Sequence, residues 1–457
     1  MHIELRQTWK DSDRFVPRRV VRPVQSFMQV EVAGGLVMLA GGILALLWAN
    51  SPWKDDYVRL WSTEVILRLG DAVHLDMDLH ALVNDGAMAL FFLIAGLEIK
   101  RQLTTGELKD PRAAALPAIG ALGGMLVPAL IYIAFNAGHA GSRGWGIPVA
   151  TDIAFAVGVV TLVGRRIPLG ARIFLLTLAV VDDVGGIIII AVAYAEGVKF
   201  EWLGVALLAV LITVLMTRVE VRSIAPYIAA GSLCWYSLHE AGVEAAIAGV
   251  IFGLLTPTKP FHNPEEFPVV AHTLVDRIAD SDEIAAEDLA RYAIETASPL
   301  ERVENRLNRW VSFLIVPLFA LANAGVEIDT SSINQRVLFG VGFGLVVGKA
   351  VGVFAFAWVA VKFGLGRLPS STTWRHMFGL ALASGIGFTV ALFVTGLSFD
   401  DEGLTSSAKL GILGASALAG LLAYLWLRAC PELSPAQLEG DSMDSSDSDE
   451  VLEGQRQ

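Results

Sequence analysis

Apolar residues fall in long runs along this chain, and short polar segments separate the runs. A helix that crosses the hydrocarbon core of a bilayer needs about 20 largely apolar residues. About twelve such runs occur, and they are 32–50, 79–101, 113–135, 147–163, 170–195, 201–219, 223–239, 241–256, 310–327, 336–361, 375–398 and 407–429. Two runs, 147–163 and 375–398, are rich in Gly and polar residues. The pattern predicts an all-α polytopic membrane protein with about 12 transmembrane helices.

The distribution of basic residues predicts the orientation of these helices. With twelve spans, both termini lie on the same side of the membrane. Most of the 34 Lys and Arg side chains fall in the segments on that side. Because short cytoplasmic segments carry the excess of Lys and Arg, both termini should be cytoplasmic. The expected location is the bacterial inner (plasma) membrane.

The chain divides into an N-terminal extension, a membrane domain and a C-terminal tail. Residues 1–31 form the basic cytoplasmic extension. Residues 32–430 form the membrane domain, which includes an acidic cytoplasmic loop at 260–309. Residues 431–457 form an acidic Ser-rich tail, whose composition predicts disorder. Residues 63–78 alternate apolar and polar positions around Gly70-Asp71, which predicts a small β-hairpin on the outer face.

Charge and composition narrow the function classes. The loop 260–309 and the tail 431–457 together account for the whole net charge of −12, so the rest of the chain, which contains the predicted spans, is close to neutral. The acidic pI of about 5.2 argues against a nucleic-acid-binding protein, which needs a basic face. Two cysteines are too few for a disulfide framework or a thiolate metal cluster.

An internal repeat connects the two polar runs. The stretch 150–157 reads ATDIAFAV, and the stretch 383–390 reads ASGIGFTV. The two copies lie in the fourth and the eleventh run, an odd number of positions apart, so they are inverted in the membrane. Inverted repeats with interrupted helices are the best sequence indication of the binding site of a secondary transporter. Chance similarity between two Gly-rich strings is the alternative.

Four ionisable residues lie within predicted spans, namely Asp152, Asp182, Asp183 and Lys349. A charge at the bilayer centre costs at least about 2.5 kcal/mol, so such residues are functional candidates. Adjacent residues on a helix point about 100° apart, so Asp182 and Asp183 cannot share one partner. Three carboxylates against one Lys leave an uncompensated negative charge, which predicts a site that accepts a cation or a proton.

Several motifs, in the same order, closely resemble the NhaA-type sodium/proton antiporters over about residues 28–430. They are FFLIAGLEIKR (91–101), ATDIAFA (150–156), VDDVGG (181–186), LANAG (321–325) and GIGFT (385–389). The resemblance implies an inverted repeat of helices 3–5 and 10–12, in which the interrupted helices 4 and 11 cross at the membrane centre.

The resemblance also implies roles for individual residues. Asp152 would neutralise the positive N-terminal ends at the crossing, and Lys349 the negative C-terminal ends. Asp183 and Asp182 would bind the ion or the protons, with Thr151 and Asp152 contributing polar groups. Asp182 would pair with Lys349 when it is deprotonated.

The expected function is therefore secondary active transport that exchanges cytoplasmic Na⁺ or Li⁺ for external protons. This makes the chain a transporter rather than an enzyme, with no cofactor and with Na⁺, H⁺ and the lipid bilayer as partners. If two protons exchange for one Na⁺, transport is electrogenic and supports sodium efflux and pH homeostasis. The outer hairpin 63–78 implies a homodimer, because it is a dimer contact in the family.

Residues for a pH response follow from the same resemblance. Glu98 and Arg101 occupy a region that the family is thought to use to tune its response, although an interfacial charge pair is an equal alternative. Glu244 stands where the family pattern has a His, so Glu244 or the acidic loop is expected to shift the pH range.

Three other readings stay open at this point. A cation/proton antiporter of the same fold with K⁺ selectivity is one of them. A retinal-type photoreceptor would use Lys349 for a Schiff base, but twelve spans oppose it. An intramembrane aspartyl protease needs two Asp residues that share a proton, whereas Asp182 and Asp183 point apart.

Overall fold

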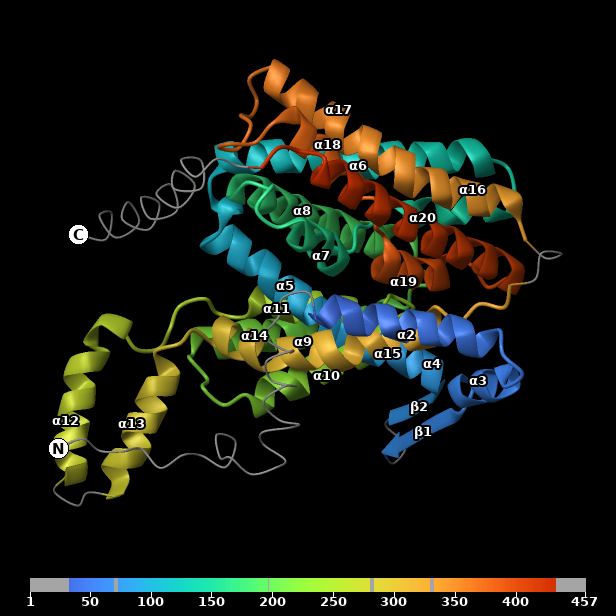
Figure 1. Ribbon diagram of the computed structural model, residues 1–457. Coiled ribbons are helices and arrows are strands. Elements are labelled where there is room, and N and C mark those ends of the chain that lie inside the picture. The colour runs from blue at the N-terminus through green and yellow to red at the C-terminus, as the bar shows by residue number, and fades with distance from the viewer. Residues whose placement is uncertain (1–32, 70–72, 196, 280–282, 329–332, 433–457) are drawn as a thin grey trace, which may run out of the picture.

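The computed structural model describes residues 33–69, 73–195, 197–279, 283–328 and 333–432. The predicted N-terminal extension, and the acidic tail beyond residue 432, lie outside these ranges. Within them the chain is mainly helical, with one pair of strands. The helices form two bundles, which lie one above the other in Figure 1.

The upper bundle in Figure 1, here named the crossing bundle, contains helices from the middle and the end of the chain. Its elements are α6 (Pro111–Asn136), the 3₁₀ segment η5 (Ala140–Val149), α7 (Ile153–Val163), α8 (Leu169–Ala193), α16 (Gln335–Phe343), the π segment η8 (Gly344–Gly348), α17 (Lys349–Lys362), α18 (Trp374–Ala383), α19 (Phe388–Ser398) and α20 (Glu402–Arg428). α6 packs along α17, where Gly123 faces Gly352. A Cβ on Gly123 would lie 2.2 Å from the Gly352 carbonyl oxygen, so only glycine permits this approach.

The lower bundle, here named the flanking bundle, is built from the remaining membrane helices. Its elements are α2 (Ala33–Ala49), α3 (Lys54–Trp61), α4 (Leu79–Ala81), the π segment η3 (Leu82–Ala87), α5 (Met88–Thr104), α9 (Phe200–Arg218), α10 (Ala225–Glu240), α11 (Ile247–Leu255), α14 (Pro299–Trp310), the π segment η7 (Val311–Ile315) and α15 (Val316–Asn323). α5 packs against α11, and α2 packs against α15. α5 contacts α8, and α15 contacts α19, so these helices join the two bundles.

The outer surface of the bundles is apolar. Long aliphatic side chains are more than half exposed on several helices, and examples are Leu47, Leu130, Leu207, Leu215 and Leu421. Six helices in the described ranges are long and apolar enough to cross a membrane, or up to nine if each of three bent pairs is one span. The predicted membrane-embedded helical fold is therefore confirmed at this level.

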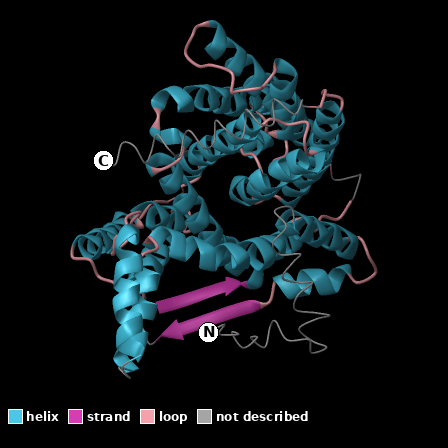
Figure 2. Ribbon diagram, turned by 60° about the vertical axis from the view of Figure 1, so that its left-hand side comes forward, coloured by secondary structure: helices cyan, strands magenta, loops and turns pink. Residues whose placement is uncertain are grey.

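The predicted hairpin is present. β1 (Glu64–Leu69) pairs antiparallel with β2 (Val73–Asp78), and Glu64 lies opposite Asp78 in the register. Figure 2 shows the two strands beside the flanking bundle, on the side away from the crossing bundle. Asp78 ends the hairpin and caps α4, because its carboxylate accepts a hydrogen bond from the Ala81 N–H at 2.7 Å.

The acidic segment 260–309 is largely helical. It contains a 3₁₀ turn η6 (Pro264–Glu266), α12 (Phe267–Ala279), α13 (Glu283–Glu295) and most of α14. α12 and α13 pack against each other and project from the flanking bundle at the lower left of Figure 1. Ser298 and Glu301 form a capping box that begins α14, which is the sequence pattern expected for a helix start.

Candidate functional site

Two interrupted helices meet inside the crossing bundle. α7 follows η5 with a bend of 45°, and α19 follows α18 with a bend of 44°. The Thr151 hydroxyl donates to the Ser384 carbonyl at 2.9 Å, and the Asp152 N–H donates to the Ile386 carbonyl at 2.6 Å. Each break therefore satisfies backbone groups that the other leaves free, as non-helical backbone at membrane depth requires.

Small residues make this contact possible. A Cβ on Gly387 would lie 3.2 Å from the Ala150 carbonyl oxygen, and a Cβ on Gly385 would lie 2.6 Å from the Leu345 carbonyl oxygen. A larger residue at Gly387 would push the two breaks apart, and one at Gly385 would push the second break away from η8. The Gly-rich motif in the second repeat copy thus serves the close approach of backbone to backbone.

Asp152 joins the two N-terminal helix ends at the crossing. Its Oδ1 accepts from the Phe155 N–H of α7 at 3.2 Å. Its Oδ2 accepts from the Thr389 N–H at 3.1 Å and from the Thr389 hydroxyl at 2.6 Å, both in α19. Because helix N-termini carry a partial positive charge, a buried carboxylate between them is well compensated. This geometry fits the role that the resemblance implies for Asp152.

Lys349 and Asp182 form an ion pair within the crossing bundle. The Lys349 ammonium lies 2.5 Å from Asp182 Oδ2, and both side chains are fully buried. Lys349 follows directly after the π segment η8, and such segments are frequent at functional sites. Among the described residues, Lys349 hydrogen-bonds to Asp182 alone and not to a helix C-terminus. The second oxygen of Asp182, Oδ1, is buried without a partner.

Asp183 is only partly buried, and it is the carboxylate that Lys349 does not bond. Asp152, Asp182 and Lys349 are the charges that act on Asp183. The structure therefore brings together all four charged residues that the sequence placed within spans. Because Asp152 already bonds to the two helix ends, the Lys349 ammonium is left to compensate both Asp182 and Asp183. This leaves one negative charge and several oxygen atoms, which suit a hard cation or a proton.

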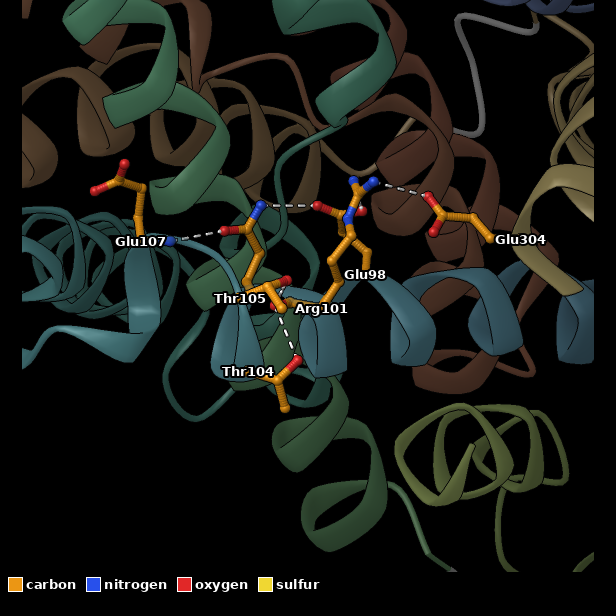
Figure 3. Close-up of polar contacts among 7 residues, drawn as sticks. Glu98, Arg101, Thr104, Thr105, Glu107 and Glu304 are labelled. Carbon is orange, nitrogen blue, oxygen red and sulfur yellow. Dashed lines mark hydrogen bonds and ion pairs between the residues drawn. The ribbon is translucent and has the colours of Figure 1, made fainter. Parts of the chain in front are cut away.

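Glu98 and Arg101 lie apart from this cluster, in a second group of charges (Figure 3). Arg101 pairs with Glu98 on α5 and, through Nη1, with Glu304 Oε1 of α14 at 3.3 Å. Burial raises the pKa of Glu304; the charges of Glu98 and Glu301 also raise it, and the charge of Arg101 opposes the rise. The three side chains connect the end of α5 to the acidic segment.

Glu244 lies away from both groups, in the loop that joins α10 to α11. The predicted run 241–256 placed it inside a span, but α11 begins only at Ile247. The loop residues and Asp85 line a polar cavity of about 270 Å³. Burial raises the pKa of Glu244 to about 7, and the charge of Asp85 adds to the rise.

Two residues of these sites were missed by the sequence interpretation. Thr389 bonds to Asp152 with both its hydroxyl and its N–H; a hydroxyl residue near the Gly-rich break of the second repeat copy was the available signal. Glu304 has no comparable signal, because it is one of many acidic residues in 260–309. Only the fold brings it next to Arg101.

Comparisons with known proteins also indicate a sodium/proton antiporter. The sequence model of the family described as Na⁺/H⁺ antiporter 1 matches residues 25–427. The chain is 42% identical over 428 residues to the Na(+)/H(+) antiporter NhaA of Syntrophobacter fumaroxidans, and the match covers 90% of each chain. It is 41% identical to the Na(+)/H(+) antiporter NhaA of Rhodopirellula baltica, covering 89% of this chain and 94% of that one.

A solved structure supports the fold. The sodium proton antiporter MjNhaP1 from Methanocaldococcus jannaschii, determined at pH 8, is similar with a TM-score of 0.50 and 14% sequence identity. The similarity covers 89% of this chain and 98% of that chain. At this identity the likeness concerns the architecture alone.

Proposed function

The chain belongs to the Na⁺/H⁺ antiporter 1 family and exchanges sodium ions for protons, and we propose that the exchange takes place at Asp182 and Asp183. The observation that carries this proposal is the surplus of carboxylate over ammonium beside the helix crossing. The comparisons favour Na⁺/H⁺ exchange and give no support to a K⁺ antiporter or a retinal photoreceptor.

The proposed chemistry is competition for the same oxygen atoms. Na⁺ is a hard cation that takes carboxylate, hydroxyl, carbonyl and water oxygens as ligands. Asp183 and Asp182 supply the carboxylates, and Thr151 and Asp152 border the same crossing. Protons and Na⁺ then exclude one another, because each needs these carboxylates. When Asp182 holds a proton, the ion pair with Lys349 is lost, so occupancy changes the contact between α8 and α17.

The site would face the two sides of the membrane in turn. Cytoplasmic Na⁺ displaces protons from the Asp182–Asp183 pair, the crossing bundle moves relative to the flanking bundle, and external protons displace Na⁺. Two protons per Na⁺ make the cycle electrogenic. The inward proton gradient then drives sodium efflux and supports pH homeostasis.

We further propose twelve spans with both termini in the cytoplasm of a bacterium. The element order supports this count when six further elements cross the membrane beside the six long apolar helices. These are α2, the bent pairs η5–α7 and α18–α19, the short helices α10 and α11, and η7 with α15. The segment 260–309 is then cytoplasmic and the hairpin is external. The inverted repeat pairs α6, η5–α7 and α8 with α16–α17, α18–α19 and α20. The hairpin 63–78 would form a homodimer contact.

The test uses the purified protein in proteoliposomes with Asp183→Asn. We expect this variant to lose sodium-dependent proton flux, because the amide can neither release a proton nor neutralise Na⁺. Asp401→Asn is the matched control: Asp401 caps α20, and Asn also serves as an N-cap. Retained flux in Asp183→Asn would remove Asp183 from the site.

A further inference from the structure

A closed ring of hydrogen bonds links three side chains of the flanking bundle. His80 Nε2 lies 3.1 Å from Asn323 Oδ1, and His80 Nδ1 lies 3.3 Å from Asn84 Nδ2. Asn323 Nδ2 donates to Asn84 Oδ1 at 2.7 Å, which completes the ring. The ring connects α4 and η3, near the hairpin, to the last turn of α15.

The ring is complete only when His80 is neutral. Asn323 Nδ2 also donates to the Phe319 carbonyl at 3.1 Å, and this bond fixes the orientation of the Asn323 amide. Asn323 Oδ1 then accepts from His80 Nε2, and His80 Nδ1 must accept from Asn84. The tautomer follows from the network.

A proton on Nδ1 of His80 breaks the ring. Imidazolium has two donors and no acceptor, so Asn84 would have to turn its oxygen toward His80. The Asn84 amino group would then face the amino group of Asn323, and two donors cannot bond each other. No arrangement of the three side chains therefore satisfies a charged His80 with the ring closed.

A cation of the other bundle lies within electrostatic range of this ring. Lys409 of α20 acts electrostatically on His80, and the other charges that act on His80 are Asp78 and Asp85. Burial disfavours a charged His80 most strongly, Lys409 disfavours it further, and the two carboxylates favour it. Lys409 is partly buried, and among the described residues it has no hydrogen-bond or ion-pair partner. His80 and Lys409 thus belong to different bundles and act on each other electrostatically across the boundary between them.

We propose that His80 is a second proton-binding site, separate from the Asp182–Asp183 pair, which opens the external end of the boundary between the bundles. This inference rests on the proposed orientation, in which the hairpin and the start of α20 are external. A proton on His80 breaks the ring and adds a second positive charge within electrostatic range of Lys409. The open arrangement, where water can solvate both cations, then binds the proton more tightly than the closed one.

A ligand shifts a conformational equilibrium by its difference in affinity for the two states. External acid therefore favours the arrangement that is open to the outside, in which the Asp182–Asp183 pair collects protons. Asp78 and Asp85 keep the charged form of His80 accessible in the open arrangement. His80 would thus couple the external proton concentration to the step that loads protons.

The experiment measures exchange in right-side-out vesicles that hold the internal pH constant while the external pH changes. Between external pH of about 8 and about 6, which spans histidine titration, we expect the rate at which external protons release Na⁺ to rise in the parent protein. In His80→Gln, we expect at least about half of that increase to be lost, since the amide carries no charge in either state.

Lys409→Gln should have the same effect as His80→Gln, because the proposal requires both cations. The double variant should then behave like either single variant, as expected for two residues that act as one unit. Asn323→Asp is a second test: a carboxylate that accepts from a charged His80 should stabilise the ring in acid, which reduces the increase. Thermal unfolding of each variant checks the fold.

The outcomes separate this inference from the proposed function. If His80→Gln and Lys409→Gln exchange Na⁺ with the same external pH dependence as the parent protein, the second proton site is refuted and the Asp182–Asp183 site is untouched. Additive effects in the double variant would also overturn the proposal. If Asp183→Asn still exchanges Na⁺, the proposed function fails instead.

Discussion

The Lys349 ammonium lies 2.5 Å from Asp182 Oδ2, and neither side chain is exposed to solvent. Removing one partner leaves an unpaired charge in the interior, which costs about 3–5 kcal/mol. We therefore expect Lys349→Ala to lower the thermal unfolding midpoint strongly. Lys349→Gln combined with Asp182→Asn should recover much of this loss, because two amides can hydrogen-bond without a buried charge. A double variant as unstable as Lys349→Ala would argue against this pairing.

Thr389→Val tests the cap that joins the interrupted helices. The variant removes the hydroxyl that donates to Asp152 at 2.6 Å but keeps the N–H donor. A hydrogen bond to a charged group contributes about 1.5–3 kcal/mol, so the free energy of unfolding should fall by about that amount. Thr389→Ser, which keeps the hydroxyl, is the control. Equal stabilities of the Val and Ser variants would contradict the expected role.

Glu304→Gln tests the second group of charges. The variant leaves Arg101 with Glu98 alone and makes this end of α5 less negative. Carboxylates nearby then lose protons more easily, so the pH midpoint of exchange should move to lower pH by a few tenths of a unit, and less at high salt. Glu287→Gln on α13 is the control, because it removes one carboxylate of the acidic segment that is not among the charges acting on Glu304. An unchanged midpoint in Glu304→Gln would exclude it from the pH response.

Glu244→Gln tests the raised pKa of the loop residue. The neutral form is favoured in the folded protein, where the pKa is about 7, relative to the ordinary value of 4.5. The folded protein thus binds this proton more tightly than the unfolded chain does. Relative to Glu244→Gln, the wild type should lose stability as pH rises from 4.5 through about 7, because the carboxylate then ionises in a desolvated position. If the difference in melting temperature between the wild type and Glu244→Gln stays constant across this pH range, the raised pKa of Glu244 is refuted.

Replacing residues 65–77 by a short Gly linker tests the dimer contact. The Thr63 carbonyl already accepts from the Leu79 N–H at 3.0 Å, so the ends of the hairpin are adjacent and Asp78 can still cap α4. We expect the dimer to dissociate, as measured by light scattering in detergent, while each protomer still exchanges Na⁺. A variant that stays dimeric would place the contact elsewhere.

Much of the fold follows from the sequence, because long apolar runs have few alternatives in a membrane. The hairpin and the interrupted stretch before α7 were also predictable, since alternation and Gly-rich breaks are local signals. The position of Glu244 was not, because an apolar run cannot show where a short helix such as α11 begins.

The sequence by itself determined which charges lie in the membrane and that carboxylates outnumber ammonium there. That conclusion needs only the cost of a charge in hydrocarbon. The tertiary structure alone decided which of two adjacent aspartates pairs with Lys349, since the rotation of α8 against α17 depends on packing. It also decided that Thr389 joins Asp152, that Glu304 pairs with Arg101, and that Lys409 lies within electrostatic range of His80. These pairs come from distant segments, and no local pattern encodes their meeting.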